Sequence, residues 1–154
     1  ARAASENDQN YIIYRLADVL LMKAEALIMQ GHNEDAADLI DRTRERAGLG
    51  ETTLSDDRMV MLETLLVERQ KEFFGEGKNW FDLLRIGLRS EQLNDTQYKT
   101  LFVEQALKAV GASRQSLGRA TLANSGSWYL PYSEDELSKN PLLEQSDYYQ
   151  SISN

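Results

Sequence analysis

The chain has 154 residues, of which 42% are hydrophobic and 27% are charged, and its formal net charge is −8. The length predicts a single domain, residues 1–154, with a hydrophobic core. The acidic charge argues against nucleic acid and anionic lipid as partners, because both need a clustered cationic face. Without cysteine, the chain has no disulfide, thiolate metal site or cysteine nucleophile.

The first ten residues, ARAASENDQN, are small and polar and lack the apolar segment of a signal peptide. We expect this chain to be the interior of something longer, or a trimmed product. The sequence contains no uninterrupted run of about 18 apolar residues, which a membrane-spanning helix would need.

A first helix is predicted from residue 11 to about residue 30. Apolar residues recur along it at the i, i+3, i+4 spacing of one helix face, namely Ile13, Leu16, Ala17, Leu20, Ala24, Leu27 and Ile28. A second apolar side is formed by Ile12, Val19, Met22 and Ala26. A helix that is apolar on two sides usually lies between neighbouring elements. Gly31 follows as its C-terminal stop.

A second helix is predicted to run to about Ala47, with Asn33 as its N-cap. The two helices and the short turn between them have roughly the size of a tetratricopeptide hairpin. Ala24 and Ala36 match small positions of that repeat, where the two helices approach closely.

A second hairpin is predicted over residues 58–87. Its first arm, residues 58–74, follows the N-cap Ser55 and is broken by Gly75 and Gly77. Its second arm starts at the N-cap Asn79.

The second arm is expected to end near Gly87, so that residues 11–87 hold two hairpins in all. An array of fewer than three such repeats is rarely stable by itself. Other parts of the protein are therefore expected to cover their open faces.

Further helices are predicted over residues 94–123, in segments at 95–110 and 113–122. Residues 125–154 hold both prolines and five aromatic residues with little periodicity, which predicts an irregular tail with one short helical turn at 133–137. The predicted fold is all-α: tetratricopeptide-like helical hairpins followed by an irregular, aromatic-rich C-terminal tail.

Four segments together resemble the C-terminal part of the RagB/SusD family of surface nutrient-binding lipoproteins of Bacteroidetes. They are YRLADVLLMKAEAL (14–27), LIDRTRERAGL (39–49), LLVERQKEFFGEGKNWFDLLRIG (65–87) and WYLPYSEDELSKNPLLEQSDYY (128–149). The residues that carry the resemblance as structural motif are Asp18, Glu25, Arg69, Glu72, Gly77, Trp80, Asp82, Arg85, Pro131, Asn140 and Pro141. The sequence departs from the family pattern at Asn79, where the family usually has Arg, and at Asp41, Thr43, Ser133, Ser146 and Asp147.

The resemblance implies a non-enzymatic protein that binds glycan, or peptide in some members, together with a SusC-like TonB-dependent transporter. It implies a surface-exposed lipoprotein of the cell outer membrane, whose signal and lipidation site would lie in the remaining N-terminal part of the protein. No cofactor and no metal site are expected from the residues, and calcium binding at the acidic patches 34–38 and 134–136, which lack an EF-hand pattern, stays open. The alternative is a generic tetratricopeptide-like protein–protein interaction module, and an all-helical glycosidase is a distant third hypothesis.

Four carboxylates near the glycine corner, Glu68, Glu72, Glu76 and Asp82, could be paired for glycoside hydrolysis. Glu68, Arg69 and Glu72, at i+3 and i+4 spacing on a helix, are more simply an ion-pair network, with Glu76 and Arg85 near helix ends. The only histidine, His32, is expected to be solvated, because no second ligand stands at metal spacing.

The aromatic residues fall into two groups. Those around the corner are expected to be core residues: Phe73, Phe74, Trp80 and Phe81. Those of the tail lie in loop sequence and are candidates for ring stacking on a ligand: Trp128, Tyr129 and Tyr132, then Tyr148 and Tyr149. Packing of the tail rings over the helices is the favoured interpretation, so the ligand-binding residues stay unknown.

Overall fold

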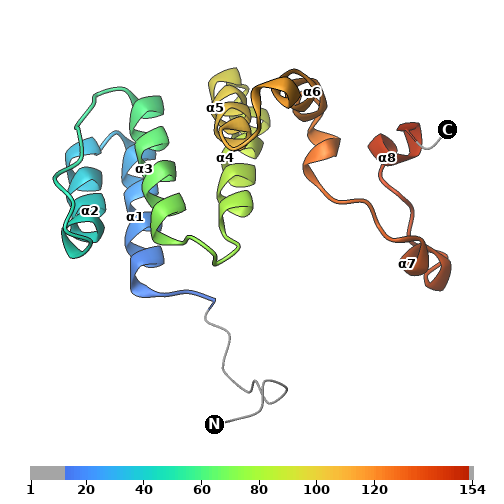
Figure 1. Cartoon of the computed structure of the whole chain (residues 1–154), viewed down its shortest axis with the longest axis horizontal. Helices are drawn as coiled ribbons and strands as arrows, with labels where there is room; N and C mark the ends of the chain where they lie inside the picture. Colours follow the sequence, from blue (N-terminus) through green and yellow to red (C-terminus); the bar gives the residue numbers. More distant parts are fainter. Residues whose placement is uncertain (1–12, 153–154) are drawn as a thin grey trace, which may run out of the picture. The chain divides into compact units, whose positions relative to one another are not determined.

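The structure, a computed structural model, describes residues 13–152 (Figure 1). Within this range the chain forms helices and loops and no strand. The all-α prediction is therefore confirmed for the described part of the chain. None of its helices is long and apolar enough to cross a membrane. The chain divides into two compact units, Ala1–Asn79 and Trp80–Asn154, which are described separately below. The single domain over 1–154 stays a prediction.

The first unit is a three-helix layer. It contains α1 (Leu16–Gln30), α2 (Asn33–Arg46) and α3 (Arg58–Glu72). Figure 1 shows α1 between α2 and α3, and α1 contacts both. Ala24 of α1 and Ala36 of α2 are completely buried, as expected of small residues at close-packed positions of the repeat. The larger core residues are Leu21, Ile28, Ile40, Met61, Leu62 and Leu65.

The turn between α1 and α2 is closed by Gly31, whose φ of +83° is accessible to glycine at little cost. Its N–H donates to the carbonyl of Ile28 at 3.1 Å, and the N–H of His32 donates to the carbonyl of Leu27 at 2.9 Å. These bonds satisfy carbonyls that the end of a helix leaves free. The predicted first hairpin is thus present.

In the first unit one predicted helix start and two predicted N-caps are wrong, whereas α3 begins at Arg58 as predicted. α1 begins at Leu16 instead of residue 11, after Arg15 in extended conformation. Asn33 is the first residue of α2 and not its cap, and its side-chain amide donates to the carbonyl of Ser55 at 2.8 Å. α3 is capped by Asp57, whose carboxylate accepts from the N–H of Met59 at 2.7 Å.

The Ser55 hydroxyl instead accepts from the N–H of Asp57 at 3.1 Å, outside the helix. Asp57 is the residue directly before the helix, so its side chain reaches the free N–H groups of the first turn. Sequence alone does not separate two good caps that lie this close together.

The second unit contains α4 (Asn79–Leu93), α5 (Thr96–Leu107) and α6 (Ala112–Leu122), then a 3₁₀ turn η1 (Ser125–Trp128) and the short helices α7 (Glu134–Lys139) and α8 (Asp147–Ile152). The helices predicted within 94–123 are confirmed. The two arms of the predicted hairpin 58–87 exist as helices, but they fall into different units.

α4 was predicted to end near Gly87, but it continues to Leu93. A Cβ at position 87 would lie 3.0 Å from Cγ of Phe102 and 3.1 Å from Cζ3 of Trp128. Gly87 is therefore a close-packing residue in mid-helix, where the absent side chain makes room for two rings. Phe102 and Trp128 are both buried, and their ring centroids are 4.6 Å apart.

The tail is more helical than predicted. The turn expected at 133–137 is α7, whose N-cap Ser133 accepts from the N–H of Glu136 at 3.2 Å. The sequence patterns do not predict α8. It is a six-residue helix, shorter than hydrophobic periodicity can reveal.

Candidate functional site

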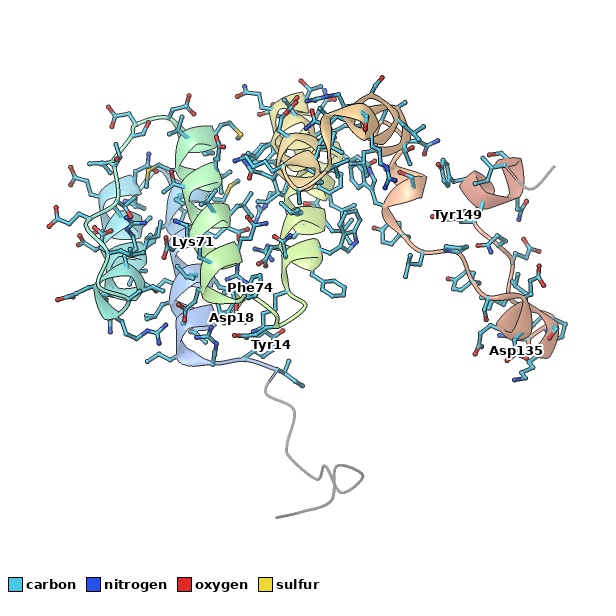
Figure 2. All side chains as sticks on the ribbon, in the orientation of Figure 1. Tyr14, Asp18, Lys71, Phe74, Asp135 and Tyr149 are labelled. Atoms are coloured by element: carbon cyan, nitrogen blue, oxygen red, sulfur yellow. The ribbon has the colours of Figure 1, made fainter. Side chains whose placement is uncertain are left out.

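The glycine corner after α3 gathers a group of charged side chains around one buried ring, and we call it the corner cluster. It consists of Arg15, Asp18, Arg69, Glu72, Phe73, Glu76 and Lys78, all in the first unit. The corner itself turns at Gly75 and Gly77, whose φ values are +80° and +73°. Asp18, labelled in Figure 2, belongs to the first turn of α1.

Asp18 is the innermost charge of the corner cluster, with a side chain only 2% exposed. One carboxylate oxygen accepts from Nη2 of Arg69 at 2.8 Å, and the other accepts from Nζ of Lys78. Burial alone would raise the pKa of Asp18, but the two hydrogen bonds outweigh it, and the pKa lies below its ordinary value. Asp18 is thus an ionised structural group.

Arg15 forms the second centre of the corner cluster. Its guanidinium donates to Glu76 at 2.9 Å, to the backbone carbonyl of Glu72 at 2.6 Å, and also to the Glu72 carboxylate. The hydrogen bond to Glu76 is the main reason why the pKa of Arg15 is raised. These contacts tie the residue that precedes α1 to the end of α3.

α2 supplies two further arginines. Arg46 donates to both carboxylate oxygens of Glu72, at 2.6 and 2.7 Å. Arg44 donates to Glu68 at 3.0 Å. These pairs join α2 to α3 through the nearly buried carboxylates of Glu68 and Glu72, and the Asp18–Arg69 pair joins α1 to α3.

Phe73 lies under three cations. Its ring centroid is 4.6 Å from Cζ of Arg15, 4.8 Å from Cζ of Arg69 and 4.8 Å from Nζ of Lys78. The negative face of an aromatic ring attracts cations at this distance. The ring thus helps to hold three like charges close together.

This geometry favours the structural interpretation of the corner carboxylates. Glu68, Glu72 and Glu76 each accept from at least one arginine, and Asp82 accepts from Arg85 at 3.0 Å within α4. A general acid in glycoside hydrolysis needs a proton and room for substrate beside it. The nearly buried Glu68 and Glu72 offer no such room.

The corner aromatics are not all core residues, contrary to the prediction. Phe73 is 4% exposed, but Phe74 is 91% exposed, and Phe81 is exposed as well. Phe73 is the C-cap of α3 and still donates from its N–H to the carbonyl of Arg69 at 2.9 Å, whereas Phe74 already belongs to the turn. Trp80 is 39% exposed, although its ring centroid lies 5.8 Å from that of Phe102. The expectation is wrong for Phe74, Trp80 and Phe81.

Among the tail aromatics, Trp128 is a core residue. It is 2% exposed, and its indole N–H donates to the carbonyl of Leu122 at 3.0 Å. It offers no free ring face to a ligand. Tyr129 and Tyr132, in contrast, are 51% and 50% exposed.

The backbone that carries these two tyrosines is held by other parts of the tail. Tyr149 donates from its hydroxyl to the carbonyl of Tyr129 at 2.7 Å. Gln145 accepts from the N–H of Tyr132 at 3.2 Å and donates to its carbonyl at 3.0 Å. Gln145 belongs to the segment 128–149 that carries the family resemblance, but its role as a clamp was not predicted, because an amide that holds a stretch of coil leaves no periodic signal.

The motif residues Glu25, Pro131, Asn140 and Pro141 lie outside the corner cluster and the tail rings. Glu25 is buried in α1. Asn140 precedes Pro141 in a turn, where its side chain accepts from the N–H of Leu142 at 3.1 Å. Pro131 lies in the exposed segment between the two half-exposed tyrosines.

His32 lines an open hollow of about 390 Å³ with Asn33, Asp35, Asp56 and Arg58. Residues 13–152 contain no group of three or more His, Asp or Glu side chains that could hold a metal ion.

The chain matches the model of the SusD family over residues 2–149. Three SusD-like proteins of Formosa agariphila are similar to it. SusD-like protein P38 is 37% identical over 89 residues, which is 53% of this chain and 18% of P38. SusD-like protein P2 is 38% identical over 99 residues, 56% of this chain and 19% of P2. SusD-like protein P25 is 28% identical over 144 residues, 92% of this chain and 24% of P25.

A solved SusD superfamily protein from Bacteroides fragilis has a similar structure, with a TM-score of 0.61 and 28% sequence identity. The match covers 89% of this chain and 28% of that protein. The chain thus spans about a fifth to a quarter of the length of these relatives. Because the family model covers nearly the whole chain, the chain belongs to the SusD family.

Proposed function

We propose that this chain is the C-terminal portion of a glycan-binding nutrient-uptake protein that has no catalytic activity. The observation that carries this proposal is the SusD family match over residues 2–149. The match includes the tail segment 128–149, which a plain tetratricopeptide-like interaction module would not need. The relatives are several times longer, so the rest of the protein is proposed as the first partner of this chain.

The finer proposals follow from the family. The whole protein would be a surface-exposed lipoprotein of the cell outer membrane, working with a SusC-like TonB-dependent transporter. The oligosaccharide, or a peptide in its place, would be captured before the transporter takes it up.

Within this chain, Tyr129 and Tyr132 are the side chains that we propose for ligand contact. Each ring is half exposed, and the backbone beneath it is held by Tyr149 or Gln145. A fixed, half-exposed ring presents an apolar face with a polar hydroxyl beside it, which suits the mixed surface of a sugar. Trp128 is not proposed, because its ring is buried.

The test is calorimetric titration of the longer protein with a panel of oligosaccharides. Tyr129→Ala and Tyr132→Ala should weaken binding and leave the thermal midpoint of unfolding nearly unchanged. Tyr14→Ala, which removes another exposed tyrosine in the first unit, is the matched control and should keep wild-type affinity. Wild-type affinity in both tail variants would remove these tyrosines from the site. Absence of binding to every oligosaccharide, and to peptides, would remove the function.

The absence of catalysis has its own test. Glu72→Gln and Glu76→Gln should lower stability, because each removes charge from hydrogen bonds with Arg15. Neither the wild-type protein nor the variants should hydrolyse the oligosaccharides that bind. Turnover in the wild type that one of these variants abolishes would identify a glycosidase.

A further inference from the structure

One side of α1 is covered by the first unit and the other side is not. The covered side consists of Asp18, Leu21, Ala24, Glu25 and Ile28, which are all buried. We call the uncovered side the α1 stripe, and it consists of Leu16, Val19, Leu20, Lys23, Ala26 and Leu27. At 3.6 residues per turn these six positions share one face, roughly opposite the covered one.

The α1 stripe is apolar although it faces outward. Leu16 is 70% exposed and Val19 is 52% exposed, while Leu20 and Leu27 are half-buried. A helix that closes a soluble structure normally carries polar side chains on its outer face. Five of the six residues of the stripe are apolar instead, which is the composition of a packing face.

The shape and charge of the stripe indicate what it would bind. Its residues follow the i, i+3, i+4 rows that receive the ridges of another α-helix. Ala26 keeps one end of the stripe low, so that a second helix can approach closely. Lys23 lies in the middle of the stripe, and within residues 13–152 its ammonium group has no hydrogen-bond or ion-pair partner. A carboxylate on a bound helix would form an ion pair with it.

The lengths of the relatives indicate where the helix that binds the α1 stripe would come from. The part that this chain matches is 18%, 19% and 24% of the three curated relatives and 28% of the solved neighbour, so most of each of those proteins lies outside the match. We propose that the α1 stripe is the seat of an amphipathic α-helix from the rest of the longer protein, with an apolar face and an acidic residue opposite Lys23. This proposal rests on the proposed function only in taking the chain as a portion of that longer protein.

The test uses the fact that this chain contains no cysteine. A single Val19→Cys variant is made in the 154-residue chain and in the full-length protein, and the labelling of that thiol by a maleimide is followed by peptide mass spectrometry. Labelling should be fast in the short chain. In the full-length protein it should be slower by on the order of tenfold or more, because it then needs local opening. The control is labelling in denaturant, which should be equally fast in both.

A second variant tests the charge. Lys23→Glu should lower the thermal midpoint of the full-length protein, because it places like charges opposite each other, and should leave that of the short chain unchanged. Lys23→Gln should have a smaller effect in the same direction.

Equal labelling of the position-19 thiol in both lengths would overturn the proposal. So would slow labelling in the short chain: if the slowing depended on concentration, the occupant would be a second copy of the chain, and if it did not, the occupant would be another part of the same chain. Glycan binding is measured separately. Protection of the thiol without glycan binding would contradict only the proposed function. Glycan binding without protection of the thiol would contradict only this inference.

Discussion

Asp18 and Arg69 lie 51 positions apart in the sequence, yet their side chains meet at 2.8 Å in the interior of the first unit, 2% and 3% exposed. Lys78 binds the second oxygen of the same carboxylate. Removing one member of such a buried group leaves the others without compensation, which costs more than the pair itself contributes.

We therefore expect Asp18→Asn to lower the free energy of unfolding by about 3–5 kcal/mol at neutral pH. Circular dichroism during urea unfolding measures it. The exposed pair Glu104–Arg119 provides the control, and Glu104→Gln should leave the urea midpoint unchanged. An Asp18→Asn chain as stable as the wild type would contradict a structural role for this ion pair.

The effect of Asp18 should depend on pH. Burial raises the pKa of its carboxyl in the folded chain, but the hydrogen bonds from Lys78 and Arg69 lower it by more, so the net shift is downward. The folded state then binds fewer protons than the unfolded state, so stability rises with pH through this range. The contribution is complete above the unfolded pKa of about 3.9 and is lost as the pH falls through the folded pKa. The stability difference between wild type and Asp18→Asn should shrink in acid, and a difference that stays constant below about pH 4 would argue against it.

The neighbours Phe73 and Phe74 should respond in opposite ways. Phe73→Ala removes a buried ring from beneath three cations and should cost about 3–5 kcal/mol of unfolding free energy. Phe74→Ala changes a ring that is 91% exposed and should shift the same quantity by about 0.5 kcal/mol at most. Equal effects of the two substitutions, measured by urea unfolding, would contradict the burial of Phe73 and the exposure of Phe74.

Gly87 should tolerate no β-branched side chain. Gly87→Val places atoms against the buried rings of Phe102 and Trp128 and should lower the stability of the second unit by about 1–3 kcal/mol. The fluorescence of Trp80 and Trp128, both in the second unit, reports the unfolding of this unit. Gly50→Val is the control in the first unit, where a Cβ meets nothing within 4 Å, and it should leave this fluorescence transition unchanged. A neutral or stabilising Gly87→Val would disprove the close packing.

Gln145 should hold the tail segment that presents Tyr132. Gln145→Ala removes the acceptor of the Tyr132 N–H, and the loss of one hydrogen bond of about 1 kcal/mol should speed exchange of that amide several-fold. Hydrogen–deuterium exchange measures it. Ser138→Ala, which removes a hydrogen bond in α7 of the same tail, should leave the Tyr132 amide unchanged. Unchanged exchange in Gln145→Ala would mean that the clamp does not order this segment.

Much of the secondary structure could be predicted from local patterns. Hydrophobic periodicity located the helices, and glycine marked the turn at Gly31, because both act over a few residues. The same local signals failed at α8, which is too short to show a period, and at Gly87, where a glycine inside a helix looks like its end.

The candidate site shows the same division. The carboxylates of the corner and the aromatics of the tail could be named from the sequence, together with the family resemblance. The partners of these side chains could not be predicted, because they are far away in the sequence: Asp18 binds Lys78, 60 positions away, and Glu72 binds Arg46, 26 positions away.

What the sequence by itself determined is an all-α chain with small residues at buried positions of α1 and α2 and a less regular tail. These features depend on residue type and spacing, which local sterics and hydrogen bonding translate directly into helices and turns. The tertiary structure alone decided that Phe73 is buried and Phe74 exposed, that Trp128 is core and Tyr132 half exposed, and that one side of α1 stays open. Burial and ion pairing depend on which segments meet in space, and that information is spread over the whole chain.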